Sequence, residues 1–193
     1  MTDARRLLPF FGVGDSMDLP NAVMGIVSSP IPERNAVYRR FLDEFGYDAG
    51  RDWFRELYEA ELAERKQKGQ DFTAPEVSGL LAELTAADGS VHEPTAGTGG
   101  LLIAAWDRAR RAVLPWEFFP SQHMVDCWEL SDRSVPILLF NLSIRGIMGY
   151  VHHGDVLEQS ARMHYVLLNR RDDALGFSEV IPDPEGKMRI IQE

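Results

Sequence analysis

Hydrophobic residues in the first third of the chain recur at helical spacing. In "ERNAVYRRFLDEFG" (33–46), Val37, Phe41 and Phe45 lie four residues apart, which predicts a helix that ends at Gly46. "GRDWFRELYEAELAERKQKG" (50–69) repeats this pattern and predicts a second helix. Residues 1–32 are mixed, with glycines and prolines as breakers, and we expect a loop at "GVGD" (12–15) and a connector into the next helix at "SSPIPER" (28–34).

From residue 70 onward, short apolar runs alternate with helical patterns. The runs at 90–94, 123–130, 149–155 and 163–169 predict strands, and the segments 73–87, 98–113 and 131–146 predict helices. The stretch "VLEQSAR" (156–162) predicts a turn or a short helix. Strands that alternate with helices favour an α/β fold with a parallel sheet covered on both faces.

Composition and charge narrow the class of protein. The 193 residues are 45% hydrophobic and 26% charged, which suits a globular domain (69–193) with an N-terminal helical extension (1–68). A formal net charge of -10 argues against tight non-specific binding of nucleic acid by this chain alone. Cys127 is the single cysteine, and no run of 18 apolar residues or signal-peptide pattern occurs, so we expect a cytoplasmic protein without disulfides.

The stretch "VHEPTAGTGG" (91–100) predicts a strand, a glycine turn and the start of a helix, an arrangement that bares backbone N–H groups to a ligand. A phosphate-binding P-loop needs a lysine that is missing here. A dinucleotide site is disfavoured because Leu102 stands at the third glycine position and Glu93 would repel a pyrophosphate. S-adenosylmethionine carries no phosphate, and Glu93 would favour its ammonium group.

Two more acids follow the next predicted strands. Glu129 ends the second strand and Asp155 ends the third, so with Glu93 they would line one edge of a parallel sheet. Each acid also has a simpler interpretation: Glu93 as a turn cap, Glu129 as a surface acid or a neighbour of a helix N-cap, and Asp155 as a helix N-cap. His152 and His153 point to opposite faces of a strand, so we expect no metal site.

These motifs together resemble the N-6 adenine DNA methyltransferases, in particular the modification subunits of type I restriction-modification systems. "GQDFTAPEV" (69–77) is similar to the aromatic-Thr-Pro segment that precedes the family's glycine turn, with Ala74 where proline is usual. "HEPTAGTGG" is similar to the turn itself, with Glu93 in place of aspartate. "ELSDRSVPILLFNL" (129–142) and "HHGDVL" (152–157) are similar to the two acidic segments that follow.

The resemblance implies a class I S-adenosylmethionine-dependent methyltransferase (Rossmann-like) fold and DNA methylation at adenine N6. It also implies DNA and restriction-modification subunits as partners. The cofactor contacts that it implies are Phe72, Thr73, Glu93, Pro94, Gly97, Gly99, Glu129 and Asp155.

The catalytic motif of the family is Asn-Pro-Pro-aromatic at the end of the fourth strand. Its asparagine accepts hydrogen bonds from the adenine amine, and its aromatic ring stacks on the flipped base. Asn169 matches this asparagine and is the expected catalytic residue, but Arg170, Arg171 and Asp172 replace the rest of the motif. The alternative is that Asn169 simply ends a strand before a polar turn.

The tail after Asn169 is too short for the second half of such a fold. We expect "FSEVIPDPEGKMRIIQE" (177–193) to form a hairpin or a strand along the sheet edge beside the fourth strand, in a fold truncated at its C-terminal half. The rival function is a non-catalytic protein that binds S-adenosylmethionine or a restriction-modification partner. A weaker alternative is methylation of RNA, protein or a small molecule.

Overall fold

The structure is a computed structural model that describes residues 3–62, 73–74, 77–80 and 89–190. Its centre is a five-stranded sheet in the order β1-β2-β3-β4-β5. The strands are β1 (Val91–Glu93), β2 (Val125–Glu129), β3 (Gly149–Asp155), β4 (Ser160–Leu168) and β5 (Glu179–Asp183). The first three strands are parallel, whereas β4 pairs antiparallel with both β3 and β5. The sheet is therefore mixed.

Two helices connect the parallel strands and lie on one face of the sheet. α7 (Gly100–Arg111) joins β1 to β2, and α8 (Ser134–Ser143) joins β2 to β3. Both connections move in the same direction across the sheet, and right-handed crossovers of this kind place their helices on the same face. The two helices touch where α7 begins, since a Cβ built on Gly99 would lie 3.0 Å from Leu138 of α8.

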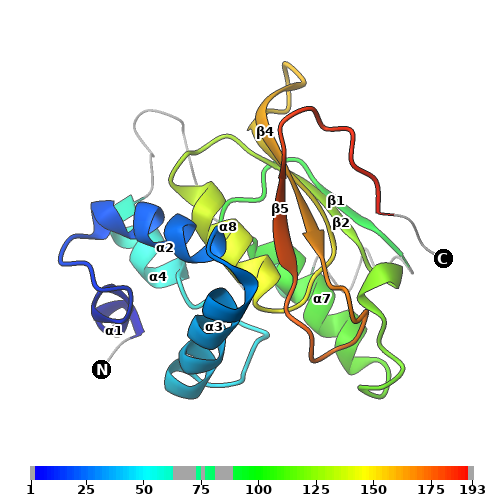
Figure 1. The fold of residues 1–193 in the computed structure, drawn as a ribbon, viewed down its shortest axis with the longest axis horizontal. Coiled ribbons are helices and arrows are strands. Elements are labelled where there is room, and N and C mark those ends of the chain that lie inside the picture. The colour runs from blue at the N-terminus through cyan, green and yellow to red at the C-terminus, as the bar shows by residue number, and fades with distance from the viewer. Residues whose placement is uncertain (1–2, 63–72, 75–76, 81–88, 191–193) are drawn as a thin grey trace.

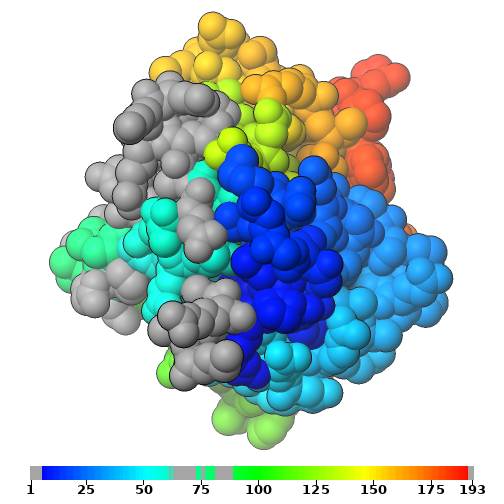
Figure 2. All heavy atoms as spheres, turned by 90° about the vertical axis from the view of Figure 1, so that its left-hand side faces the viewer, coloured from blue at the N-terminus to red at the C-terminus, as the bar shows by residue number. Residues whose placement is uncertain are grey.

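The N-terminal helices form a further layer outside α8. They are α1 (Asp3–Phe10), the 3-10 turn η1 (Ser16–Asp18), α2 (Leu19–Val27), α3 (Ile31–Phe45), α4 (Arg55–Leu57) and the π turn η2 (Tyr58–Leu62). In Figure 1 they lie beside α8 on the side away from the strands. Figure 2 shows α1 and α2, in the darker blues, at the surface of this side of the molecule. A 3-10 turn, η3 (Pro120–Gln122), precedes β2.

α8 is the centre of the hydrophobic core because it is enclosed by the sheet and by the N-terminal layer. Every residue of this helix is buried, including its two serines and its asparagine. The ring of Phe140 packs within 5.5 Å, centroid to centroid, of Phe11, Tyr38, Phe41 and Phe54. A helix that is apolar on nearly all sides is stable only when it is covered in this way.

Buried hydroxyl groups at the two ends of α8 are paired with tyrosines of the N-terminal layer. Tyr38 Oη lies 2.6 Å from Ser143 Oγ, and Tyr58 Oη lies 2.6 Å from Ser134 Oγ. Burial raises the pKa of Tyr38 to about 12, so this phenol stays protonated at physiological pH. The N-terminal helices thus share one core with α8, and the domain boundary predicted at residue 68 lies outside the described residues.

The structure corrects one expectation about the fold and refines another. Residues 1–32, expected as a mixed segment with a loop at 12–15, contain α1 and α2, and that loop lies between α1 and η1. Pro20 sits in the first turn of α2, where a missing N–H has no helical partner to lose. The fourth strand, expected to be parallel, is antiparallel because only residues 156–159 separate it from β3. A parallel crossover needs a dozen or more residues.

Other expectations are confirmed. α3 ends at Phe45, and Gly46 follows with a φ of 92° as its C-cap. The tail forms β5, which pairs along the outer edge of β4 as expected. Beyond it, Ile190 N donates to Tyr150 Oη at 2.8 Å, so the chain after β5 crosses back to β3. None of the described helices is long and apolar enough to cross a membrane.

Candidate functional site

The glycine turn lies where β1 ends and α7 begins, as the sequence predicts. Gly97 and Gly99 adopt positive φ angles of 56° and 95°, a region that side-chain-bearing residues avoid. Ala96 N donates to Trp128 O at 2.9 Å, which ties the turn to β2. A Cβ on Gly100 would meet no atom within 4 Å, so the turn presents bare backbone to open space at that residue.

Glu129, at the end of β2, holds the glycine turn in place. Its Oε2 accepts a hydrogen bond from Gly97 N at 2.7 Å, and its Oε1 accepts one from Ser131 N at 2.7 Å. The residue is only 7% exposed, so these charge-assisted bonds operate with little competition from water. The surface-acid interpretation of Glu129 is therefore wrong.

A cavity of about 220 Å³ opens between the glycine turn, the N-terminal layer and the segment around Ser78. Three of the predicted cofactor residues line it: Thr73, Glu93 and Gly97. The other described residues that line it are Asp52, Arg55, Ser78, Thr95, Ala96, Thr98, Gly100 and Leu101. The cavity is polar on the side of the turn and is smaller than the 300 to 1,000 Å³ typical of a complete small-molecule site.

Glu93 and Asp52 are the two acids among the described residues that line this cavity. The half-buried position of Glu93 raises the pKa of its carboxyl group above the ordinary value, while a hydrogen bond from the Thr95 backbone and the nearby His92 lower it. No Lys or Arg among the described residues forms an ion pair with it. Burial therefore disfavours the ionised form unless a cation enters the cavity.

The remaining predicted cofactor residues lie apart from the cavity or outside the described chain. Asp155 ends β3 at the same sheet edge, where its Oδ1 accepts hydrogen bonds from Leu157 N at 2.9 Å and Glu158 N at 3.3 Å. It thus caps the β3–β4 turn and does not line the cavity. Pro94 is exposed, and Phe72 lies outside the described residues.

The structure does not bring Asn169 to this edge of the sheet. Because β4 is antiparallel, its end pairs with the beginning of β3, through Leu167 and Gly149. Asn169 therefore follows the edge opposite to the glycine turn. The expectation that placed it near the cofactor assumed a parallel fourth strand, and that assumption is wrong.

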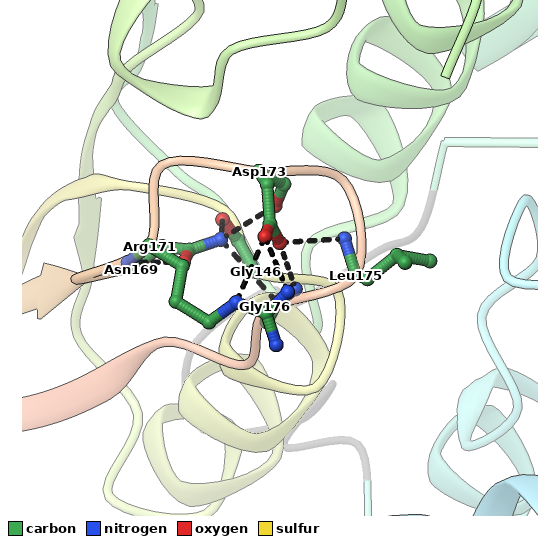
Figure 3. Close-up of polar contacts among 6 residues, drawn as sticks. All are labelled: Gly146, Asn169, Arg171, Asp173, Leu175 and Gly176. Atoms are coloured by element: carbon green, nitrogen blue, oxygen red, sulfur yellow. Dashed lines mark hydrogen bonds and ion pairs between the residues drawn. The ribbon is translucent and has the colours of Figure 1, made fainter. Parts of the chain in front are cut away.

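Asn169 instead organises the loop between β4 and β5. It is 2% exposed, and its Nδ2 donates to Asp173 O at 2.9 Å, Gly176 O at 3.3 Å and Gly146 O at 3.4 Å. Arg171 N donates to its Oδ1 at 3.2 Å. Figure 3 shows the amide enclosed by the loop, with these bonds converging on it. Its catalytic role stays a prediction that the geometry does not support.

Asp52 also belongs to the site, although nothing in the sequence analysis predicted its position there. Its Oδ2 accepts a hydrogen bond from Thr98 Oγ1 at 2.5 Å, and its Oδ1 accepts one from Asn141 Nδ2 at 2.9 Å. The only local signal was its position before a short helix, where Phe54 N donates to Oδ1 at 3.0 Å as in an N-cap. Its contacts with the turn join residues 46 positions apart in the chain.

The part of the chain that the structure describes contains no candidate metal-binding site. No group of three or more His, Cys, Asp or Glu side chains there is placed to hold a metal ion. His152 and His153 lie on opposite faces of β3 and pair with different acids, Asp126 and Asp132. Cys127 is fully buried, and burial raises the pKa of its thiol well above the ordinary value.

The sequence matches the family described as N-6 DNA Methylase over residues 49–173, well over half of the chain. This match begins in the N-terminal layer just before Asp52 and ends in the loop that contains Asn169. Among curated protein sequences, no match was found.

The structure matches parts of two solved structures. One is described as a modification subunit of a type I restriction enzyme from Vibrio vulnificus YJ016, with 19% identity over 67% of this chain and a TM-score of 0.41. The other is a type I restriction-modification system methyltransferase subunit from Streptococcus thermophilus, with 16% identity over 82% of this chain and a TM-score of 0.45. The chain spans 25% and 39% of their respective lengths.

Proposed function

The chain belongs to the N-6 DNA methylase family, and from this premise we propose that it is the S-adenosylmethionine-binding part of a DNA adenine-N6 methyltransferase. In this proposal β1, β2, β3, α7 and α8 form the cofactor-binding half of a class I methyltransferase fold. The support is topological, because ligands of open α/β sheets bind at the carboxyl ends of parallel strands. Here that edge carries the glycine turn and three acids.

The observation that carries the proposal is the position of Glu93 in the cavity beside bare backbone. Glu93 is a half-buried carboxylate that forms no ion pair with a described Lys or Arg, since Arg55, which also lines the cavity, pairs with Glu59 instead; such a carboxylate favours a cationic ligand. S-adenosylmethionine carries an ammonium group and a sulfonium, and it carries no phosphate that Glu93 would repel.

The cavity residues divide into ligand contacts and supports. We assign Glu93 to the ammonium group, and the hydroxyl groups of Thr73 and Thr95 and the open backbone at Gly100 to polar contacts with the cofactor. Glu129 supports Gly97 through its Oε2. The two hydrogen bonds that Asp155 accepts from the β3–β4 turn both go to Oδ1, and we assign its Oδ2 to a hydroxyl group of the cofactor. When bound, the cofactor supplies a methyl group on a sulfonium sulfur.

Methyl transfer to adenine needs a group that polarises the exocyclic amine, and Asn169 lies at the other edge of the sheet. Among the described residues that line the cavity, none carries a side-chain amide. We therefore assign the polarising group and most DNA contacts to other segments or subunits of a larger assembly. The same observation favours the second candidate, a domain that binds the cofactor without catalysis on its own.

Calorimetric titration tests cofactor binding. We expect S-adenosylmethionine to bind the wild type and to bind Glu93→Gln about tenfold more weakly, as for loss of one charge-assisted contact. Glu158→Gln is the matched control, because Glu158 is exposed in the β3–β4 turn and does not line the cavity. Equal affinity of all three proteins would remove Glu93 from the site, and absence of binding to the wild type would reject the proposal.

S-adenosylhomocysteine refines the assignment, since it keeps the ammonium group but has lost the sulfonium charge. An equal loss of both ligands in Glu93→Gln places the acid at the ammonium. Transfer of a tritiated methyl group to unmethylated DNA then separates the two candidates. A chain that binds the cofactor yet transfers no methyl group is a cofactor-binding part, whereas transfer that Asn169→Ala abolishes without unfolding the protein would restore Asn169 as the catalytic residue.

A further inference from the structure

A second cavity, of about 260 Å³, lies between α3 and the loop that joins β4 to β5. Four arginines line it: Arg34, Arg39, Arg170 and Arg171. Glu179 is the one acidic residue among the described residues of its lining. This concentration of positive charge is unusual for a chain whose net charge is -10.

Arg34 is the inner residue of this cavity. It is only 2% exposed, yet none of the described carboxylates lies within ion-pair distance of its guanidinium group. Its Nε and Nη2 both donate to a single neutral acceptor, Asn35 Oδ1, at 3.2 and 2.9 Å. Its Cζ also lies 5.5 Å from the ring centroid of Tyr38. A guanidinium group has five N–H donors, so most of its capacity remains for a ligand.

Burial of a charge without a counter-ion is unfavourable, and most proteins avoid it. An anion in the cavity would compensate this charge. The N-terminus of α3 also favours an anion in the cavity. α3 begins at Ile31, which lines the cavity, and a helix N-terminus attracts negative charge.

Arg170 and Arg171, in the loop between β4 and β5, each pair with an acid. Arg170 pairs with Glu179, and Arg171 pairs with Asp173, each at 2.7 Å. Asp173 Oδ1 also accepts hydrogen bonds from Leu175 N at 3.0 Å and Gly176 N at 2.7 Å. Figure 3 shows the bonds of Asp173 closing the loop, with Leu175 pointing away from it. The charges of these two arginines are therefore compensated, in contrast to that of Arg34.

Arg39 differs from these two residues because it has no carboxylate partner among the described residues. It is exposed at the rim, one helical turn beyond Asn35 on α3. A ligand held by Arg34 would thus meet a second uncompensated guanidinium group at the mouth of the cavity. Arginine suits oxyanions because its planar fork matches two oxygens of a phosphate.

We propose that this cavity binds a phosphate group, with Arg34 as its inner contact and Arg39 as its outer contact. The site is independent of the proposed cofactor site, since it lies at the opposite end of β4 and shares no lining residue with that cavity. The phosphate can come from a free ion or from a nucleic-acid backbone, and the two sources share the same recognition chemistry.

The test is thermal unfolding and calorimetry of the full chain in inorganic phosphate, against chloride at the same ionic strength. We expect phosphate to raise the Tm of the wild type, because a ligand that binds the folded state stabilises it. Arg39→Ala should weaken phosphate binding about tenfold. Arg40→Ala is the matched control, since it removes the same charge from the next residue of α3, where Arg40 lies over Phe10 instead of the cavity.

Arg34→Met distinguishes a binding role from a structural one. If Arg34 serves to bind an anion, its replacement by an apolar side chain of similar length should leave the Tm in chloride unchanged or raise it. The same replacement should abolish the increase in Tm that phosphate causes in the wild type. A short DNA duplex as competitor then identifies the source: displacement of phosphate at constant ionic strength indicates a backbone phosphate, and no displacement indicates a free ion. No phosphate effect on the wild type, or equal effects in Arg39→Ala and Arg40→Ala, would overturn the proposal.

Discussion

Asn141 of α8 donates a hydrogen bond from Nδ2 to Asp52 Oδ1 at 2.9 Å, across 89 positions of sequence. The same amide group donates to Thr98 O at 2.8 Å, and Thr98 Oγ1 donates to the other carboxylate oxygen of Asp52. These bonds join the N-terminal layer, the central helix and the glycine turn at one point. The shape of the candidate cofactor cavity therefore depends on residues far from the motif that identifies it.

Asp52→Ala should destabilise the protein by about 3 kcal/mol, because the buried amide of Asn141 loses one of its two acceptors and the buried hydroxyl of Thr98 loses its acceptor. The free energy of unfolding in urea measures this effect. Asp18→Ala is the control, since Asp18 is exposed and makes no side-chain cap bond to α2, and its replacement should change stability by less than about 0.5 kcal/mol.

A double-mutant cycle makes this prediction specific. Asp52→Ala and Thr98→Val should together destabilise the protein by about 1 to 2 kcal/mol less than the sum of the single changes, because both remove the same bond. Additive effects would show that the bond contributes nothing to stability.

Glu93→Gln should stabilise the protein at neutral pH while it weakens cofactor binding. Burial makes the pKa of Glu93 higher in the folded state than in the unfolded chain. Between these two pKa values the folded state holds more protons, so stability falls as pH rises through that window. Glu93→Gln cannot lose a proton and so does not show this fall in stability. Its free energy of unfolding at pH 7 should exceed that of the wild type by less than about 1 kcal/mol, because solvent screens a half-exposed group.

Urea unfolding at pH 4 and pH 7 checks the sign. The difference between Glu93→Gln and the wild type should be larger at pH 7 than at pH 4. A constant difference at the two values would mean that the carboxyl group titrates alike in the folded and unfolded states. Glu158→Gln again serves as the control.

The sequence was sufficient to predict that three acids lie at one edge of the sheet, because parallel strands that are joined by helices end at the same edge. Glu93, Glu129 and Asp155 could be placed there by counting strands alone. Hydrophobic spacing likewise located α3, whose apolar positions recur with the period of a helix, whereas α8 was located as an apolar run too long for a strand.

The direction of β4 was also within reach of the sequence. The apolar run begins at Met163 and the strand at Ser160, so the expected connection had seven residues, which is still too short for a parallel crossover. In contrast, the contacts of Asp52 with Thr98 and Asn141 could not be predicted from the sequence. They join separate elements, and no local spacing records which distant groups a buried carboxylate will meet.

Asn169→Ala should destabilise the protein by about 3 kcal/mol, because three carbonyl oxygens in the β4–β5 loop lose a shared donor. Asn169→Asp should be at least as harmful, since it directs a carboxylate oxygen toward those carbonyls. Gln122→Ala, at an exposed position in η3, is the control. Unfolding in urea gives the comparison, and an Asn169→Ala protein of unchanged stability would show that the amide is not needed to hold the loop.

Gly146 and Gly12 offer a matched pair, because both have a φ of 70° but their surroundings differ. A Cβ on Gly12 would meet nothing within 4 Å, whereas a Cβ on Gly146 would lie 2.2 Å from Gly176 O and 2.8 Å from Asn169 Nδ2. Gly12→Ala should therefore lose about 1 kcal/mol for the left-handed backbone alone. Gly146→Ala should lose a further 2 kcal/mol or so, because the β4–β5 loop must move to make room. Urea unfolding of the two variants isolates this difference, and equal losses would mean that the loop around Asn169 is loosely packed.

The same displacement would move Arg170 and Arg171, so Gly146→Ala should also weaken phosphate binding while Gly12→Ala leaves it unchanged.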